Sequence, residues 1–505
     1  MKFNESSKAQ NKTFNSEGAP AYRLSPEWHL YTAAVTSLLS DKFYEGAQDR
    51  IHVLRELIGR CDPQFVAKLA VYAREQMYLR SVPLVLAVEL AKVHNGDATV
   101  RRTVARVVQR ADEITELLAY YQQANGRKGT KKLNRLSKQL QAGLQDAFNR
   151  FDEYQFAKYD RATAIRLRDA LFLVHPGAKD EAQQALFDKI AARKLETPYT
   201  WETELSALGQ TKFESPEARA TAFRHKWEAL IDSGKIGYMA LMRNLRNLLE
   251  TGISTKHVKQ VCDALSAPDA VRKSRQFPFR FLAAYRELSG VRSGHTSRIM
   301  SALEQAVLVS AQNIAGFDED TRVLVACDVS GSMQKAISAK SAVKNYDIGL
   351  MLGMLLKSRC KNALAGMFGD TWKIVNLPGA GVLSSVDAFY RREGEVGYST
   401  NGYLVVQDLI DHRIAMDKIM IFTDCQLWDN TGCDNEMVAV WTKYKQMFPD
   451  ARLYLFDLAG YGNTPLSIDS GDVYLIAGWS DKIFDMLAAL ERGSDALTEI
   501  GKTEL

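Results

Sequence analysis

The feature that most constrains the fold of this chain is a change in its hydrophobic pattern at about residue 316. Before it, from about residue 25, apolar residues recur at helical spacing in stretches of roughly 12–18 residues between short polar breaks. After it, short apolar runs rich in β-branched residues, such as VLVACD, alternate with helical stretches. The two patterns predict an all-α part followed by an α/β part.

The all-α part is expected to stack helical pairs in the manner of divergent HEAT-like repeats, because many helices follow one another without a fixed sequence period. Asp62-Pro63 predicts the start of one helix, since Asp caps and Pro fits the first helical position. Further helices are expected near 100–121, 131–149, 161–174, 180–193, 235–250, 255–266, 279–288 and 297–312.

The α/β part repeats strand and helix at the spacing of βαβ units, which predicts a mostly parallel, doubly wound sheet. A chain of 505 residues is too long for one core, since single cores stop growing at about 250–300 residues. The predicted organisation is a polar flexible tail at 1–20, a helical-repeat domain at 21–315 and an α/β domain at 316–505.

Oxygen-bearing side chains follow two of the predicted strands. VLVACD runs directly into VSGSM, which gives the pattern D-x-S-x-S at Asp328, Ser330 and Ser332, and KIMIFTD ends at Asp424. Ligands of doubly wound sheets bind at the carboxyl ends of the strands. Carboxylates and hydroxyls are hard ligands that suit Mg²⁺. The alternative is that a strand-end Asp and two turn serines cap the next helix.

Together with Thr400 in the segment GYSTNG, these residues resemble the metal-ion-dependent adhesion site of von Willebrand factor A domains. The resemblance implies one divalent ion, most simply Mg²⁺, held by Asp328, Ser330, Ser332, Thr400 and Asp424. Cys425 departs from it, because many such domains carry Gly there. Ser399 competes with Thr400 for the loop position, and we favour Thr400.

Charge is divided unevenly along the chain. Residues 1–320 carry 47 Lys+Arg against 37 Asp+Glu, whereas residues 321–505 carry 18 against 23. Within the first part, window 101–150 has 11 basic and 4 acidic residues, and window 251–300 has 9 and 3. Clustered cations neutralise phosphates and favour sequence-tolerant nucleic-acid binding, although a single run is more often a solvated helix face. The first window nominates Arg127, Lys128, Lys131, Lys132 and Arg135 for RNA binding.

Several separated blocks resemble, in order, the TROVE domain of the Ro autoantigen family. They are LYTAAVTSLLSDKFYEG, FVAKLAVYAREQMYLRSVPLVLAVELA, GYMALMRNLRNLL and FPFRFLAAY. That family carries a von Willebrand factor A domain after a helical-repeat ring, so the resemblance covers about residues 20–505. It implies binding of misfolded noncoding RNA ends in the ring and of Y RNAs on its rim, with an exonuclease or other RNA-processing protein left open as a partner.

The stretch KYDRATAIRLRDALFLVHPGAKD resembles the family's outer RNA surface. It nominates Lys158 and His175 directly, and Arg161 and Arg166 less directly. Arg243 is a further nominee, with Asn244 beside it, although a role inside a helix is equally open for that pair.

The function expected is that of a non-enzymatic, cytoplasmic RNA-binding protein of noncoding-RNA quality control, with no membrane or DNA partner. No phosphate loop, H-E-x-x-H or G-x-S-x-G motif is present. Six cysteines without a C-x-x-C pair fit a reducing compartment better than a disulfide or zinc framework. A metal-dependent protein-interaction module and a metal-dependent nuclease remain alternatives.

Overall fold

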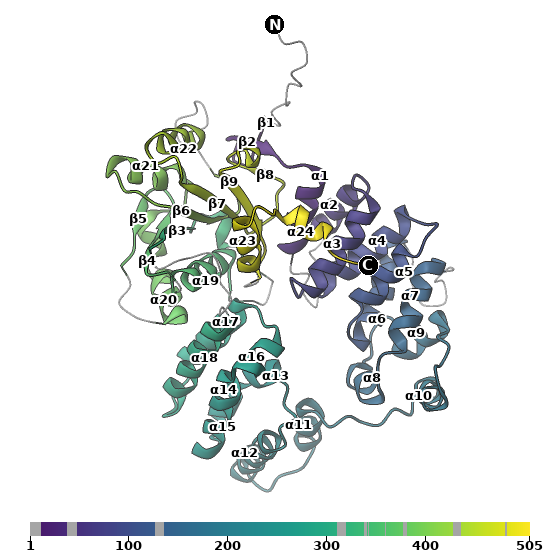
Figure 1. Cartoon of the computed structure of the whole chain (residues 1–505). Helices are drawn as coiled ribbons and strands as arrows, with labels where there is room; N and C mark the ends of the chain where they lie inside the picture. Colours follow the sequence, from purple (N-terminus) through teal and green to yellow (C-terminus); the bar gives the residue numbers. More distant parts are fainter. Residues whose placement is uncertain are drawn as a thin grey trace. The chain divides into compact units, whose positions relative to one another are not determined.

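The computed structural model describes residues 12–37, 48–126, 136–310, 320–337, 341, 343–358, 360–376, 381–427, 436–479 and 482–505 (Figure 1). The chain divides into two compact units, each drawn from separate stretches of sequence. Unit 1 contains residues 1–37 and 262–497, and unit 2 contains residues 38–261 and 498–505. The predicted boundary at 315/316 lies where helices give way to strands, but the compact units divide the chain elsewhere.

Unit 2 is all-α in the part that the structure describes. Its helices are α2 (Gln48–Ile58), α3 (Pro63–Glu75), α4 (Ser81–Val93), α5 (Thr99–Val107), α6 (Ala111–Ala124), α7 (Lys138–Phe148), α8 (Glu153–Tyr159), α9 (Leu167–Val174), α10 (Glu181–Ala192), α11 (Trp201–Gly209), α12 (Pro216–Asp232), α13 (Tyr238–Arg243) and α14 (Leu245–Glu250). The boundary with unit 1 falls inside α15 (Thr255–Ser266) and again inside α24 (Ala496–Gly501).

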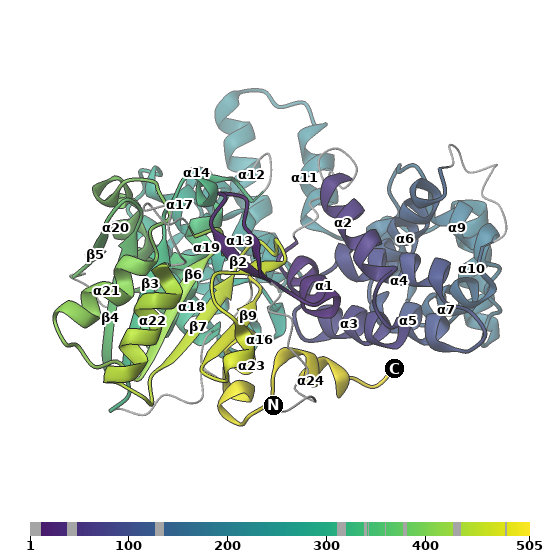
Figure 2. The ribbon, with the colours of Figure 1, turned by 90° about the horizontal axis from the view of Figure 1, so that it is seen from above.

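Successive helices of unit 2 stack through their apolar faces, as the repeat interpretation predicts. Helix α3 packs on α4 and α5, α5 packs on α7, and α4 packs on α6, so α3, α5 and α7 follow one another in Figure 2. The predicted start of α3 is confirmed, because the Asp62 side chain accepts a hydrogen bond from the Gln64 amide with Pro63 in the first turn. Among the described helices none has the length and apolarity to cross a bilayer.

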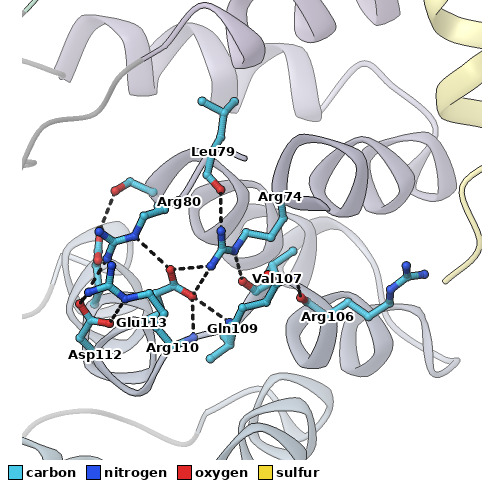
Figure 3. A network of polar contacts seen from close by, with 12 residues as sticks. Arg74, Leu79, Arg80, Arg106, Val107, Gln109, Arg110, Asp112 and Glu113 are labelled. Atoms are coloured by element: carbon cyan, nitrogen blue, oxygen red, sulfur yellow. Dashed lines mark hydrogen bonds and ion pairs between the residues drawn. The ribbon is translucent and has the colours of Figure 1, made fainter. Parts of the chain in front are cut away.

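A buried carboxylate, Glu113, holds three of these helices together (Figure 3). Its side chain is fully buried and forms ion pairs with Arg74 of α3, at 2.9 Å, and with Arg80, at 3.3 Å. It also accepts the backbone N–H groups of Gln109 and Arg110, at 2.8 and 3.0 Å. Four partners compensate the cost of removing this charge from water.

The same carboxylate explains why the helix predicted over 100–121 is two helices. By accepting the amides of Gln109 and Arg110, Glu113 caps the start of α6 and ends the continuity with α5. The helix predicted over 235–250 is likewise interrupted, at Asn244. The buried Asn244 side chain donates to the carbonyl of Ala240 at 2.8 Å, where α13 ends and α14 begins.

Unit 1 contains an α/β sheet domain and helices from both sides of it in sequence. Its helices are α1 (Pro26–Val35), α16 (Pro268–Ser274), α17 (Pro278–Ser289), α18 (Thr296–Ser310), α19 (Asn345–Lys357), α20 (Val382–Tyr390), α21 (Tyr403–Asp411), α22 (Glu436–Met447) and α23 (Ile483–Glu491). Its strands are β1 (Lys12–Phe14), β2 (Pro20–Arg23), β3 (Arg322–Asp328), β4 (Asn362–Phe368), β5 (Trp372–Ile374), β6 (Lys418–Thr423), β7 (Arg452–Asp457), β8 (Asn463–Thr464) and β9 (Val473–Ala477).

The predicted doubly wound sheet is confirmed. Six strands pair in the order β5-β4-β3-β6-β7-β9, and all neighbours are parallel except the edge strand β5, which the sequence did not reveal. Side chains such as Leu324 and Ala326 form one core with α21 and α22. Helix α19 covers the opposite face (Figure 1). The expected fold class, an all-α part followed by an α/β part, is therefore correct.

Helix α19 approaches the sheet closely at Gly353. A Cβ atom there would lie 2.7 Å from Cγ1 of Val325 and 3.2 Å from the sulfur of Cys327, both on β3. We expect Gly353→Ala to push α19 away from the sheet and to destabilise the domain by about 1–3 kcal/mol, the range for overpacked cores. Thermal unfolding of the variant tests this, with Gly290→Ala as the control, because nothing lies within 4 Å of a Cβ at that glycine.

The segment from Lys12 to Pro20 is not a flexible tail, contrary to the sequence prediction. Strand β1 pairs with β2, and β2 pairs with β8, in a separate antiparallel sheet. The buried Asn15 side chain donates to the carbonyl of Leu427 at 2.7 Å. The pattern was missed because β1 and β2 are too short to show a period, and their partner lies more than 400 residues away.

Helices α17 and α18 belong to unit 1 because they pack on the α/β domain. Arg286 of α17 makes two hydrogen bonds of 2.7 Å to the carboxylate of Asp347, which lies fully buried in the first turn of α19. Glu304 of α18 accepts the amides of Leu383 and Ser384 at the start of α20. These contacts join helices that the sequence assigned to the other domain.

Candidate functional site

The predicted metal residues meet at the point where the chain reverses direction across the sheet. From β3 the chain moves outward to β4 and later returns to β6 on the other side of β3. Doubly wound sheets bind ligands in the crevice at such a switch point, at the carboxyl ends of the strands. Asp328 ends β3, and Asp424 directly follows β6.

Asp328 is held in place by two short contacts. One carboxylate oxygen accepts the amide of Ser330 at 2.9 Å, and the other accepts the hydroxyl of Thr423, the last residue of β6, at 2.6 Å. The hydroxyls of Ser330 and Ser332 lie 3.2 Å apart. Burial, followed by the negative charge of Asp424, raises the pKa of Asp328. Thr423 was not nominated from the sequence, although its position at the end of the second strand was a usable signal.

Asp424 carries a buried oxygen that nothing in the described part of the chain satisfies. Its Oδ1 atom accepts the amide of Gln426 at 3.0 Å, whereas Oδ2 is buried without a hydrogen-bond partner among the described residues. Burial raises the pKa of this carboxyl, and the nearby Ser332 hydroxyl acts in the opposite direction. A buried, unpartnered carboxylate oxygen is costly, and a bound cation is one group that would satisfy it.

The loop that contains Thr400 is fixed beside the D-x-S-x-S turn. The Gly331 amide donates to the carbonyl of Tyr398 at 2.9 Å, and Thr400 is buried. The Ser399 amide donates to Asp370 at 2.8 Å, and hydrogen bonds from the Ser399 side chain and backbone lower the pKa of Asp370. Because Ser399 is engaged with Asp370, the structure favours Thr400 as the loop residue of the site.

Cys425, the position that departs from the von Willebrand pattern, adopts a left-handed backbone with φ of 61° and is buried. Glycine reaches this conformation without strain, whereas a residue with a Cβ does not. Cys425 therefore stands at a position whose backbone conformation glycine would adopt more easily.

The residues present suit a hard divalent cation. Two buried carboxylates at the ends of neighbouring strands, one with an unsatisfied oxygen, are accompanied by hydroxyls rather than by sulfur or imidazole. Within the described residues, no group of three or more His, Cys, Asp or Glu side chains forms a possible metal cluster. The candidate centre thus combines two carboxylates with several hydroxyls, and its occupation by a metal ion stays a prediction.

The predicted RNA residues fall into three groups. The first group lies outside the residues that the structure describes and comprises Arg127, Lys128, Lys131, Lys132 and Arg135. In the second group, Lys158 lies on α8, Arg161 and Arg166 are exposed in the segment before α9, and His175 ends α9. His175 has a left-handed backbone, with φ of 50°, and its carbonyl accepts a hydrogen bond from Gln145, so it has a helix-ending role.

In the third group, Arg243 and Asn244 separate clearly. Arg243 is exposed at the end of α13, whereas Asn244 is buried and bonded to the backbone of its own helix. The helix-interior role that the sequence left open applies to Asn244.

A group of stacked cations and aromatic rings around α8 was only partly anticipated. The Arg110 guanidinium lies 4.4 Å from the ring centre of Tyr159, and the Lys158 ammonium lies 5.7 Å from the rings of both Tyr154 and Tyr159. Tyr154 is 44% exposed. Burial raises the pKa of Tyr159, and the positive charge of Arg110 opposes this. Arg110 was missed because it precedes the nominated stretch by almost 50 residues.

Comparison with known proteins agrees with this arrangement. The TROVE domain profile matches residues 32–193 and 189–312, more than half of the chain. The crystal structure of the Deinococcus radiodurans Ro (RSR) protein superposes with a TM-score of 0.58, over 93% of this chain and 100% of that chain, at 18% identity. At this identity, the likeness shows the fold alone.

Two curated relatives are similar over half of the chain. Telomerase protein component 1 of Rattus norvegicus is 28% identical over 342 residues, or 51% of this chain and 12% of that protein. The protein of the same name from Mus musculus is 28% identical over 339 residues, with the same shares. The chain therefore spans only a small part of these relatives. From the matched profile we conclude that the chain belongs to the TROVE-domain family, a family of RNA-binding components of ribonucleoproteins.

Proposed function

We propose that this protein binds structured noncoding RNA on unit 2 and acts, without catalysis of its own, in cytoplasmic RNA quality control. The observation that carries the proposal is the cation–aromatic group of Arg110, Tyr154, Lys158 and Tyr159, with Arg161 exposed next to it. Cations neutralise phosphates, and aromatic faces stack unpaired bases. The resemblance to Ro proteins suggests Y-like RNAs and the ends of misfolded RNAs as ligands, and an exonuclease as a partner.

Alanine at Lys158, Arg161 and Arg166 should weaken binding of a structured small RNA and flatten its salt dependence. Each phosphate contact contributes about 0.7–0.9 to the slope of log affinity against log salt, so the loss of three contacts should lower the slope by about 2–3. Fluorescence anisotropy with a labelled stem–loop RNA at several salt concentrations measures both quantities. The matched control replaces Lys256, Arg391 and Lys443 with alanine. An equal loss of RNA affinity and of salt slope in this control would refute a specific binding surface.

The five cations nominated in window 127–135 are tested separately. Simultaneous charge reversal of Arg127, Lys128, Lys131, Lys132 and Arg135 should weaken binding of single-stranded RNA, because clustered charge drives sequence-tolerant association. An unchanged affinity and an unchanged salt slope would show that this window is a solvated face.

We further propose that Asp328, Ser330, Ser332, Thr400 and Asp424 hold one divalent ion, with Mg²⁺ as the expected species. The unsatisfied Oδ2 atom of Asp424 supports this assignment. When bound, the ion would neutralise the two buried carboxylates and leave coordination positions for water or a partner's carboxylate. The serine hydroxyls orient towards one another, and Thr423 fixes Asp328.

Magnesium should therefore stabilise the 505-residue chain against heat. An ion at one hundred times its Kd adds about 2.7 kcal/mol to the stability of the state that binds it. Differential scanning calorimetry should show one unfolding transition at a higher temperature in Mg²⁺ than in chelator, and this difference is the expected shift. Asp328→Ala should abolish the shift while leaving RNA affinity unchanged, and Asp450→Asn, at an exposed acid, should retain it. The absence of any shift in the unaltered protein would refute the metal site.

A protein-interaction role for the same edge of unit 1 is a second candidate, supported by one observation. Tyr398, whose carbonyl bonds the D-x-S-x-S turn, is 51% exposed. Exposed aromatic residues often anchor protein partners. Tyr398→Ala would then release a protein that co-purifies only in the presence of Mg²⁺.

Metal-dependent RNA cleavage that Asp328→Ala abolishes would instead support a nuclease.

A further inference from the structure

The turn between β1 and β2 is bound to the segment that follows β6 at the candidate metal centre. The buried side chain of Asn15 donates to the carbonyl of Leu427 at 2.7 Å. The amide of Ser16 donates to Oε1 of Gln426 at 2.8 Å. The amide of Gln426 in turn donates to Oδ1 of Asp424 at 3.0 Å. A single residue therefore links the turn to a carboxylate that we assign to the metal site.

Asn15 also fixes the shape of this turn. Its Oδ1 atom accepts the amides of Glu17 and Ala19, at 3.1 and 2.9 Å, and its carbonyl accepts the amide of Gly18 at 3.1 Å. Gly18 has φ of 81°, a conformation that glycine adopts without strain. Each of these hydrogen bonds uses the backbone of residues 17–19, so a new side chain at Glu17 leaves them in place.

Glu17 brings a third negative charge to the metal centre. Its side chain is exposed at the tip of the turn. Burial raises the pKa of Asp424, and the charge of Glu17 acts in the same direction, so the charge of Glu17 is felt at Asp424. Without a cation the two carboxylates repel each other, whereas a divalent cation between them would attract both.

No cationic side chain balances these charges in the part of the chain that the structure describes. Asp328 and Asp424 are each 1% exposed, and Oδ2 of Asp424 has no hydrogen-bond partner there. None of the three acids forms an ion pair with a described residue. Gly331 is exposed and Ser332 is half-buried, so the centre is open to solvent at the D-x-S-x-S turn. A hard divalent ion is a group that would neutralise all three carboxylates.

From these contacts we infer that Glu17 supplies the carboxylate for the position that the proposed ion leaves open, so the β1–β2 turn is an internal cap on the metal centre. The inference rests on the metal site proposed above. Glu17 binds the ion directly or through one of the waters that Mg²⁺ keeps. An acid from a partner protein must then displace Glu17 before it can bind.

Calorimetric titration of Mg²⁺ into the 505-residue chain tests the inference. Glu17→Ala should weaken Mg²⁺ binding at least about tenfold, the lower end of the loss when a group that supports metal ligands is removed. Asp450→Ala removes an exposed acid at the opposite end of the strands, before β7, and should leave the affinity unchanged. Equal Mg²⁺ affinities of Glu17→Ala and the unaltered chain would overturn the inference and leave the metal site standing. Absence of Mg²⁺ binding to the unaltered chain would overturn both.

Acetate distinguishes a missing carboxylate from a loosened turn. It should restore part of the Mg²⁺ affinity of Glu17→Ala, because it can occupy the position that the side chain has left. It should not change the affinity of the unaltered chain, where Glu17 fills that position, and sodium chloride of equal ionic strength is the control. An affinity of Glu17→Ala that acetate does not restore would overturn the inference.

Hydrogen exchange of residues 12–23 reports on the cap itself. Mg²⁺ should slow the exchange of these amides in the unaltered chain, because the ion binds the turn through Glu17. It should not slow their exchange in Glu17→Ala. If Mg²⁺ binds the unaltered chain without slowing exchange in this segment, the turn is not a cap.

Discussion

Replacing Glu113 with alanine should lower the stability of unit 2 by about 3–5 kcal/mol, the usual cost of breaking a buried ion pair from one side. The reason is that the variant leaves the buried guanidinium of Arg74 without its carboxylate partner. Its side chain is only 8% exposed, and burial already lowers the pKa of its guanidinium, an effect that Glu113 opposes. Among the described residues, the carbonyls of Val107 and Leu79 would then be the remaining hydrogen-bond partners of the Arg74 guanidinium.

Because the protein has two compact units, peptide-level hydrogen exchange is the appropriate measurement. Amides of α3 and α6 should exchange faster in Glu113→Ala, and those of the six-stranded sheet should not. Glu56→Ala removes an exposed glutamate of α2 and should change little. Simultaneous replacement of Arg74 and Glu113 by leucine should recover part of the loss. If the single variant exchanges like the unaltered protein, Glu113 does not hold these helices together.

Replacing Arg286 with leucine should destabilise unit 1 by a similar amount, about 3–5 kcal/mol. Asp347 is fully buried, and the two hydrogen bonds from Arg286 are its contacts with α17. A further hydrogen bond to Asp347 within the described part of the chain comes from the amide of Lys344, which caps α19 and does not neutralise the charge. Arg286 also lies 4.5 Å from the ring centre of Tyr390, so the variant loses a cation–π contact as well.

Limited proteolysis and hydrogen exchange measure the effect of Arg286→Leu on each helix. Protection should fall in α17 and in the first turn of α19. Arg292→Leu, at an exposed position just after α17, is the matched control. An Arg286→Leu/Asp347→Asn double variant should be more stable than Arg286→Leu alone, because it removes the unpaired buried charge. Equal stability of the two variants would mean that Asp347 is compensated by other groups.

The sequence predicted correctly those features that depend on neighbours along the chain. Asp62 and Pro63 start α3 because a cap and its helix are contiguous. The D-x-S-x-S turn places Ser330 against Asp328 because the two residues are only two positions apart. The change in hydrophobic period near residue 316 distinguished helices from strands, since each period is a property of one element.

Features that depend on distant partners required the tertiary structure. The hydrogen bond between Thr423 and Asp328 spans 95 residues and exists because β3 and β6 are neighbours in the sheet. The break between α5 and α6 follows from the carboxylate of Glu113, which binds both the start of its own helix and Arg74, 39 residues earlier.

By itself, therefore, the sequence determined the change from helices to alternating strands and helices, the central parallel strands and the residue types at the two strand ends. Only the tertiary structure decided which helices belong with the sheet, which carboxylates are buried, and that one oxygen of Asp424 and one of Asp472 lack a partner among the described residues. The physical reason is that the sequence shows which apolar or charged side chains need a partner. Which residue becomes that partner depends on how distant segments of the chain pack.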